Sequence, residues 1–207
     1  MTGFFITIEG GEGAGKSTMM DRVANWLESR NHVVVRTREP GGTELAESLR
    51  TILLDRNNDT LCSLTELLLM FASRAQHLAE VIRPALVRGE TVLCDRFTDA
   101  TWAYQGGGRQ MPAAEIATLE KLVHGDLQPD LTLLLDLPVE TGMKRASLRS
   151  DYDRFEVESL VFFERVRNAY LDRASEQSKR FEVIDAARDV ENVWTQIVKV
   201  LEQRIAL

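Results

Sequence analysis

The sequence predicts an α/β fold in which a five-stranded parallel sheet carries helices on both faces. Five short apolar runs have the length and composition of buried strands. Segments with apolar residues at helical spacing separate these runs, an order typical of a parallel sheet covered on both sides. A glycine-rich loop joins the first run to the first helical segment. These three observations indicate a single α/β domain over residues 1–207.

The predicted strands and helices follow one another along the whole chain. The strands are expected at Phe4–Ile8, His32–Thr37, Thr91–Cys94, Leu131–Leu137 and Phe181–Ile184. Helical spacing recurs within Ser17–Arg30 and within Ser63–Leu86, the longest predicted helix. Pro84 is expected to bend or end this longest helix. The polar stretch Arg149–Arg154 interrupts two helical segments, so we expect it to be unpacked and to belong to a small lid at about 145–156.

Composition excludes several classes of protein. A chain of 207 residues with 44% apolar residues can bury the core of one domain. Its net charge of −7 argues against general binding to nucleic acid or to an anionic membrane, since both favour a basic surface. Cys62 and Cys94 lack metal-binding spacing, which fits free thiols in a reducing compartment. No apolar stretch approaches the ~20 residues of a membrane span, and no signal segment is evident, so we expect a soluble, cytoplasmic protein.

The glycine-rich loop has the spacing of a phosphate-binding site. Residues 8–18 read IEGGEGAGKST and match the pattern G-x-x-x-x-G-K-[ST]. Glycines allow successive backbone N–H groups to converge on a phosphate, and the following helix N-terminus adds partial positive charge. Lys16 is expected to reach the terminal phosphates and the Ser17 hydroxyl to bind Mg²⁺. The loop therefore predicts a nucleoside triphosphate; a glycine-rich turn with a chance lysine is the alternative.

Charged residues follow three further predicted strands. Arg38–Gly42 comes after the second strand, Asp95–Phe97 after the third, and Asp136 ends the fourth. Open α/β sheets bind ligands beyond the carboxyl ends of their strands. These residues therefore predict a second binding site beside the phosphate loop.

Four further segments carry a family resemblance. They are TREPGGTELAE (37–47), LLLMFASRAQH (67–77), CDRFTDATWAYQGGGR (94–109) and KRASLRSDYDRFE (144–156). Together with the glycine loop they span nearly the whole chain in order, and the sequence resembles bacterial thymidylate kinases. The resemblance implies a P-loop kinase fold that uses ATP with Mg²⁺ to convert dTMP to dTDP. It also implies a homodimer formed through long apolar helices that include residues 63–86, with no nucleic acid or membrane as partner.

The resemblance implies a donor site around the glycine loop. The residues expected to bind ATP are Gly10, Gly11, Glu12, Gly13, Ala14, Gly15, Lys16, Ser17, Thr18 and Arg145. Arg145 matches a residue that packs against adenine, with the loop of residues 186–188 beneath it. Asp95 is expected to support Mg²⁺ together with Ser17, because Mg²⁺ usually keeps several waters and binds one or two carboxylates.

The resemblance implies an acceptor site as well. The residues expected to bind dTMP are Glu12, Glu39, Pro40, Phe71, Arg74, Arg96, Thr101, Tyr104 and Gln105. Phe71 matches a residue that stacks on thymine, although it also lies on the apolar stripe of its helix and could be core. Arg74 would bind the base edge and Arg96 the phosphate of dTMP. Glu12 would reach toward the 3′-hydroxyl.

Catalysis is expected to depend on Lys16, Arg96, Glu12 and arginines of the lid. The acceptor is already an anionic phosphate, so no strong general base is required. We interpret the three histidines, His32, His77 and His124, as structural. Some thymidylate kinases carry an arginine in the loop where this chain has Gly13. We therefore expect the compensating charge from Arg149 first and from Arg154 second, although Asp153 and Glu156 could hold Arg154 in a local salt bridge.

Two alternatives to this function remain open. The chain could be a P-loop kinase that acts on another monophosphate, although the segments around Glu39 and Arg96 favour thymidylate. It could also be a non-catalytic nucleotide-dependent switch, although the switch motifs D-x-x-G and N-K-x-D are absent from the sequence.

Overall fold

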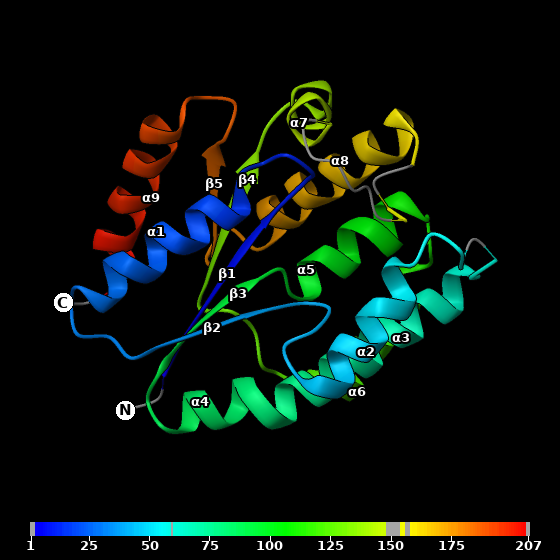
Figure 1. The fold of residues 1–207 in the computed structure, drawn as a ribbon, viewed down its shortest axis with the longest axis horizontal. Helices are drawn as coiled ribbons and strands as arrows, with labels where there is room; N and C mark the ends of the chain where they lie inside the picture. Colours follow the sequence, from blue (N-terminus) through cyan, green and yellow to red (C-terminus); the bar gives the residue numbers. More distant parts are fainter. Residues whose placement is uncertain (1–2, 59, 148–153, 156–157, 206–207) are drawn as a thin grey trace.

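The computed structural model describes residues 3–58, 60–147, 154–155 and 158–205. Its sheet has five parallel strands in the order β2-β3-β1-β4-β5, which confirms the predicted fold class (Figure 1). The strands are β1 (Phe4–Gly10), β2 (Val34–Arg38), β3 (Thr91–Asp95), β4 (Leu131–Asp136) and β5 (Phe181–Asp185). Ile8 of the central strand pairs with Asp95, so the carboxyl ends of β1 and β3 reach the same edge of the sheet.

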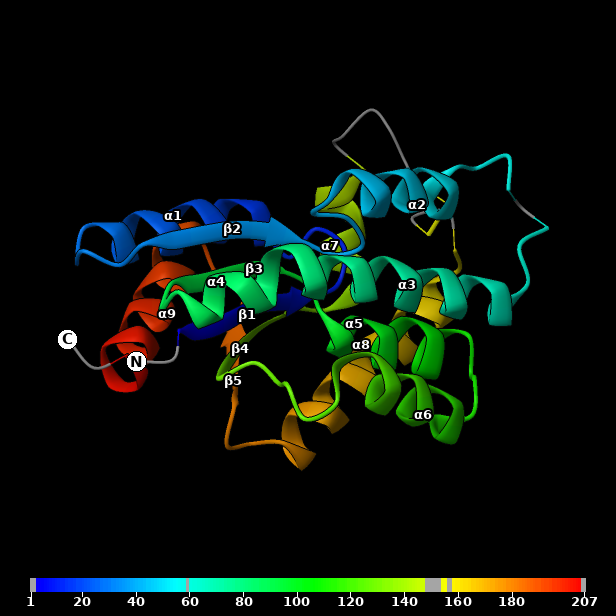
Figure 2. The same cartoon turned by 90° about the horizontal axis from the view of Figure 1, so that it is seen from below.

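Helices cover both faces of the sheet. They are α1 (Lys16–Glu28), α2 (Glu44–Leu54), α3 (Ser63–His77), α4 (Arg83–Val87), α5 (Thr98–Thr101), α6 (Ala113–His124), α7 (Val139–Ala146), α8 (Leu160–Glu176) and α9 (Val190–Arg204), with π-helical segments η1 (Leu78–Ile82) and η2 (Trp102–Gly108). Ile6 and Ile8 of β1 pack with α1 and α9 on one face, whereas Phe5 packs with η1 and α4 on the other. Figure 2 shows α2, α3 and α6 gathered at the end of the molecule away from α1 and α9.

The longest predicted helix is continuous but changes its hydrogen-bonding pattern. Residues 63–87 form α3, η1 and α4 without a break, so Pro84 does not end the helix. The N–H of Arg83 donates to the Leu78 carbonyl at the end of η1, and Pro84 then lies in the first turn of α4. Inside a helix, a proline removes one backbone hydrogen bond and crowds the carbonyl four residues earlier. Here the π-helical turn η1, which has a different hydrogen-bonding pattern, lies just before Pro84.

The expectation of an unpacked polar stretch at Arg149–Arg154 is wrong for its last residue. Arg154 is buried, and it donates to the Leu53 carbonyl over 2.9 Å and to Glu66 over 2.5 Å. Phe155 beside it is buried as well. Arg149 lies outside the described residues. Among the helices that the structure describes, none is long and apolar enough to cross a membrane.

Candidate active site

The glycine loop connects β1 to α1 and requires glycine at two positions. Gly15 caps α1 with a φ of +87°, a left-handed conformation that glycine adopts without steric cost. Gly13 has a φ of +69°, and a Cβ atom there would lie 2.0 Å from the carbonyl oxygen of Gly142 in α7. This close approach leaves no room for a side chain at position 13, which is where an arginine stands in some thymidylate kinases.

Lys16 extends back across this loop. Its Nζ donates to the carbonyl of Gly10 over 3.2 Å and to that of Gly11 over 3.0 Å. Burial lowers the pKa of Lys16, and the nearby charge of Arg96 lowers it further. Both of these hydrogen-bond acceptors are uncharged, so the ammonium group can neutralise an anionic ligand in the loop.

A cavity of about 290 Å³ opens beside the loop. Its lining includes Glu12, Lys16, Ser17, Arg38, Glu39, Pro40, Arg50, Leu54, Met70, Arg74, Asp95, Arg96, Phe97, Thr101, Tyr104, Gln105 and Phe155. The cavity thus brings together the phosphate loop and all the expected acceptor residues except Phe71. These residues come from strand ends, α2, α3, α5 and η2, which converge on one edge of the sheet.

Arg74 is buried in the wall of the cavity and presents an unused donor. Its Nε donates to Glu39 over 2.6 Å, and its Nη2 donates to the Phe97 carbonyl over 3.1 Å and to Thr101 over 3.0 Å. Its Nη1 is buried without a partner among the described residues. Burial alone would raise the pKa of Glu39, but Arg74 and His77 outweigh it, and the pKa is lowered. The ion pair therefore stays charged and holds Arg74 in place for a ligand.

Arg96 supplies a further guanidinium to the cavity lining. One of its nitrogens, Nη2, donates to Glu12 over 2.8 Å and to the Tyr104 hydroxyl over 3.0 Å, while Nη1 donates to the Tyr170 hydroxyl over 3.1 Å. Burial opposes its charge, yet the pKa is raised well above its ordinary value because of Tyr104, Tyr170 and the nearby carboxylates. The guanidinium stays cationic and is suited to bind a phosphate.

The expected Mg²⁺ residues fit that ion. Ser17 and Asp95 both line the cavity, and Oδ1 of Asp95 is buried without a hydrogen-bond partner among the described residues. No group of three or more His, Cys, Asp or Glu side chains in the described part of the chain could hold a metal by itself. One hydroxyl and one carboxylate suit Mg²⁺, which completes its coordination with water and substrate phosphates.

Six of the expected site residues that the structure describes do not border the cavity: Gly10, Gly11, Thr18, Phe71, Arg145 and Arg154. Phe71 is buried in a cluster with Leu67 and Ile116, and its neighbour Met70 borders the cavity instead. Arg145 donates to the carbonyls of residues 186 and 187 over 2.8 and 3.2 Å, which is the loop expected beneath it. Arg154 is bound to Glu66.

Sequence reasoning missed several residues of this region. Met70 and Arg50 line the cavity, and Glu9 and Tyr170 bond the residues around Arg96. Glu9 could have been found from the sequence, because it lies at the end of an apolar strand and a carboxyl group buried there needs hydrogen-bond partners. Nothing in the residue pattern around Tyr170 indicated that its hydroxyl would contact Arg96.

Comparison with known proteins decides the family. A family model described as thymidylate kinase matches residues 8–197. The chain belongs to the thymidylate kinase family. A thymidylate kinase of Pseudomonas syringae pv. tomato is 56% identical over 207 residues, which cover 100% of this chain and 99% of the relative. One of Pseudomonas fluorescens is 58% identical over 197 residues, which cover 95% and 94% of the two chains.

A solved structure agrees with this membership of the thymidylate kinase family. The crystal structure of a thymidylate kinase from Ehrlichia chaffeensis at 2.15 Å superposes with a TM-score of 0.79 at 35% identity, covering 98% of this chain and 100% of that one. The resemblance in the sequence motifs is thereby confirmed. Membership of the family makes the protein a kinase, an enzyme of phosphoryl transfer.

Proposed function

We propose that the protein transfers the γ-phosphoryl group of ATP to the 5′-phosphate of dTMP and releases dTDP and ADP. The observation that carries this proposal is the cavity that joins the phosphate loop to Arg74 and Arg96. Lys16 would hold the donor phosphates at one end, and the arginines would hold a nucleoside monophosphate at the other. The resulting proximity and charge neutralisation are what phosphoryl transfer requires.

The acceptor would lie between Arg74 and Arg96. The unpartnered Nη1 of Arg74 supports a hydrogen bond to a base edge. In the described structure, Arg96 keeps one N–H on Nη1 and that of Nε beside its contacts with Glu12, Tyr104 and Tyr170, and these support charge-assisted hydrogen bonds to the 5′-phosphate. The base would rest near Met70, with Thr101, Tyr104, Gln105, Glu39 and Pro40 around the nucleoside. Glu12 would accept from the 3′-hydroxyl, in addition to its present contacts with Arg96 and Tyr104.

In the reaction, an oxygen of the dTMP phosphate forms a bond to the γ-phosphorus of ATP. The bond between this phosphorus and the β–γ bridging oxygen breaks, and ADP leaves with the electron pair. The attacking oxygen carries no proton that must be removed, so no general base is needed. Lys16 and Arg96 stabilise the charge on the transferring group, a role of fixed cations that typically contributes about 10²–10³ in kcat for each donor.

Ser17 and Asp95 would hold Mg²⁺. The bound ion would neutralise charge on the donor phosphates. Adenine would pack against Arg145, whose position over residues 186 and 187 is consistent with this role.

Further positive charge would come from Arg149 or Arg154. Arg149 lies outside the described residues. Arg154 is held in a buried ion pair with Glu66, so its guanidinium would have to exchange this carboxylate for the phosphoryl group. Arg149→Ala is expected to lower kcat by at least about 10²-fold with little change in ATP affinity, while wild-type kcat in both alanine variants would refute a role for either arginine.

An assay of ADP release tests the proposed function. Wild-type protein with ATP and Mg²⁺ is given dTMP, dUMP, dCMP, AMP or GMP, and Lys16→Ala is the control for the active site. We expect dTMP to be the best acceptor, with dUMP poorer by about 10- to 200-fold because it lacks one methyl group. Lys16→Ala is expected to lose at least about 10²-fold in kcat. Equal or better turnover of AMP, GMP or dCMP would overturn the assignment.

A further inference from the structure

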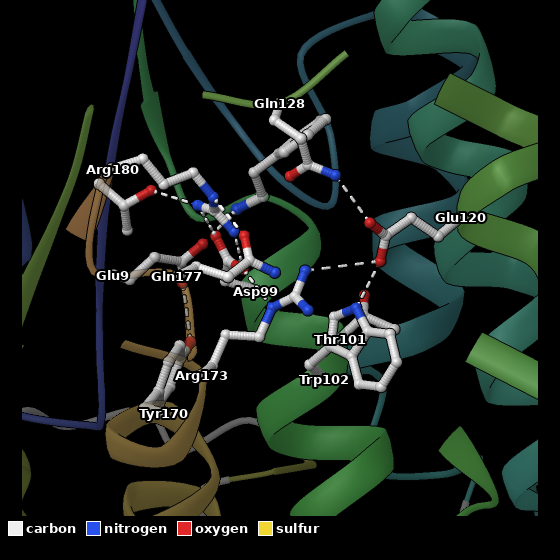
Figure 3. Close-up of polar contacts among 12 residues, drawn as sticks. Glu9, Asp99, Thr101, Trp102, Glu120, Gln128, Tyr170, Arg173, Gln177 and Arg180 are labelled. Carbon is white, nitrogen blue, oxygen red and sulfur yellow. Dashed lines mark hydrogen bonds and ion pairs between the residues drawn. The ribbon is translucent and has the colours of Figure 1, made fainter. Parts of the chain in front are cut away.

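Glu9 is a buried carboxyl group that does not border the cavity. It is the last residue before the glycine at the end of β1, and its side chain is completely buried. Its Oε1 accepts from the backbone N–H of Phe97 over 2.7 Å. Its Oε2 accepts from the Tyr170 hydroxyl over 2.8 Å (Figure 3). Both partners adjoin Arg96. Phe97 follows it in the chain, and the Tyr170 hydroxyl contacts its guanidinium.

Arg96 has a backbone conformation that needs support. Its φ is +67°, in the left-handed region that residues with a Cβ atom rarely adopt. Such a conformation persists only where the surrounding structure holds it. The N–H of Arg96 donates to the Ile8 carbonyl over 3.1 Å, and the next N–H, that of Phe97, donates to Glu9. Residues 8 and 9 of β1 thus hold the main chain on both sides of the strained position.

Glu9 also contacts the guanidinium of Arg96 indirectly, through the Tyr170 hydroxyl. The Tyr170 hydroxyl accepts from Nη1 of Arg96 over 3.1 Å while it donates to Glu9. Tyr170 is buried on α8, and its ring packs edge-on against Tyr104, which also contacts Arg96. The Glu9 side chain therefore supports Arg96 both at its backbone and, through Tyr170, at its guanidinium.

The two arginines nearest to Asp99 bind that carboxylate and not Glu9 in the described structure. Asp99 is also fully buried, but it is bound by Arg180 through two contacts of 2.7 Å and by Arg173 through another of 2.7 Å (Figure 3). The two arginines neutralise the charge of Asp99. Among the described residues, the hydrogen bonds of the Glu9 carboxylate go to Phe97 and Tyr170.

We propose that Glu9 is a positioning residue that sets the orientation of Arg96 toward the acceptor phosphate, through the Phe97 N–H and the Tyr170 hydroxyl. This inference rests on the proposed function, in which Arg96 binds the phosphate of dTMP. It predicts that Glu9 acts on the acceptor and not on the donor. It also predicts that the effect of Glu9 depends on the presence of Arg96.

Titration calorimetry on the full chain tests this role, with dTMP and a non-hydrolysable ATP analogue as ligands. Glu9→Met has a similar length but bonds neither partner, so we expect dTMP binding to weaken by about 10-fold or more with ATP-analogue binding unchanged. Tyr170→Phe is expected to weaken dTMP binding in the same direction. Glu9→Gln is the conservative variant: its amide can accept from Phe97 and donate to the Tyr170 hydroxyl, so dTMP affinity should stay within about threefold of wild type.

Two controls separate positioning from general stability. Thr7→Val removes a buried hydroxyl from the same strand, one that lies 2.9 Å from the Thr132 hydroxyl and contacts neither Arg96 nor Tyr170 in the described structure, so dTMP affinity should not change. In an Arg96→Ala background, Glu9→Met should cause no further loss of dTMP affinity. An equal loss in that background, an equal loss for the ATP analogue, or unchanged dTMP binding in both Glu9→Met and Tyr170→Phe would overturn the inference. Failure of the wild-type enzyme to phosphorylate dTMP would instead contradict the proposed function.

Discussion

Met70 and Phe71 are neighbours on α3, yet of the two Met70 borders the cavity and Phe71 packs into the core with Leu67 and Ile116. A helix turns by about 100° per residue, so adjacent side chains face different surroundings. The sequence motif could not determine which of these two adjacent residues faces the cavity and which belongs to the core. The structure favours Met70 as the neighbour of the base, and the stacking role of Phe71 stays a prediction.

A pair of alanine variants distinguishes these two positions. Met70→Ala is expected to raise KM for dTMP with little change in KM for ATP, because it removes contact area from the acceptor cavity. Phe71→Ala is expected to lower the free energy of unfolding by about 3–5 kcal/mol with dTMP affinity largely retained, because it creates a core cavity. Steady-state kinetics and urea unfolding measure both quantities. A large rise in KM for dTMP in Phe71→Ala, with wild-type stability, would restore Phe71 to the stacking role.

Glu9 also makes a prediction about pH. Burial raises its pKa to about 8, with the charge of Asp99 as the second cause, while Arg96 and the hydrogen bonds from Tyr170 and Phe97 act against these two. Between the ordinary pKa of glutamate, about 4.3, and about 8, the folded state binds more protons than the unfolded state. The stability from this group is therefore fully present below about pH 4.3 and is lost as pH rises through about 8.

Urea unfolding of wild type and Glu9→Gln across pH 5–9 tests this assignment. Gln is a neutral mimic of the protonated acid, so the two proteins should have similar stability near pH 5. The free energy of unfolding of Glu9→Gln should exceed that of wild type by a growing margin toward pH 9. A difference that is constant with pH would mean that the Glu9 carboxyl does not titrate in this range.

At the scale of elements, the contact between the glycine loop and α7 explains a departure from part of the family. The Cβ position of Gly142 lies 2.4 Å from the Glu12 carbonyl oxygen, and that of Gly13 lies 2.0 Å from the Gly142 carbonyl oxygen. Two glycines thus allow the loop and the helix to touch through their backbones. Any side chain at position 13 would separate them, which supports our proposal that further catalytic charge comes from another element of the chain.

Gly13→Ala tests this packing. The methyl group must displace α7 or the loop and meets an unfavourable φ, so we expect weaker ATP binding and a lower kcat. Gly11→Ala is a comparison in the same loop, because a Cβ atom there meets no protein atom within 4 Å among the described residues, although Gly11 is itself expected to bind ATP. Wild-type kinetics in Gly13→Ala would show that the contact between α7 and the loop has no effect on activity.

The segment formed by α5 and η2 is anchored by the buried cluster of Asp99, Arg173 and Arg180. Arg180 also donates to Thr132 of β4 over 2.7 Å, so the cluster joins α5 to α8 and to the sheet. Hydrogen bonds to both arginines lower the pKa of Asp99 despite burial, which alone would raise it. This anchoring sets the position of Thr101 and Tyr104 along the cavity.

Asp99→Asn is expected to lower the free energy of unfolding by about 3–5 kcal/mol, because it removes the carboxylate that pairs with the buried Arg180. Among the described residues, Arg173 would keep only its longer ion pair with Glu120, at 3.6 Å. Thermal unfolding followed by circular dichroism measures the effect. Asp126→Asn is the surface control, since its salt bridge with Lys121 is exposed and such pairs contribute at most about 1 kcal/mol. Similar melting temperatures for both variants would refute the anchoring role.

At the scale of the whole molecule, α3 presents apolar side chains that the single chain leaves exposed. Leu64 and Leu68 are 52% and 49% exposed, and they border a shallow groove between α3 and α6. We propose that this face contributes to the homodimer expected from the family. Burial of these leucine side chains against a second copy of the chain would remove apolar surface from water and thereby stabilise the dimer.

Sedimentation equilibrium of wild type and Leu68→Glu tests the dimer. We expect wild type to sediment as a dimer and Leu68→Glu to shift toward monomer, because a carboxylate at the interface would lose its hydration. Val190→Glu is a control at another exposed apolar residue, on α9 at the end of the molecule away from α3 and α6 (Figure 2). A wild-type monomer at micromolar concentration would refute the dimer, and a dimer that both variants retain would refute this interface.

The sequence by itself determined the parallel sheet, the phosphate loop and the charged strand ends, because these depend on residues close together in the chain. Periodicity, glycine spacing and the residue after each strand are local features. They were sufficient to predict the cavity residues Glu39, Arg74, Arg96, Thr101, Tyr104 and Gln105 once the family resemblance was added.

Only the tertiary structure decided which side chains share a partner. Tyr170 and Glu9 are 161 positions apart, and Arg154 reaches Glu66 across 88 positions. Such contacts depend on how helices pack over the sheet, since packing brings distant positions within hydrogen-bond distance without any local pattern. For the same reason, the sequence could not determine that Met70 rather than Phe71 borders the cavity, or that Arg154 is buried against α2 and Glu66 of α3.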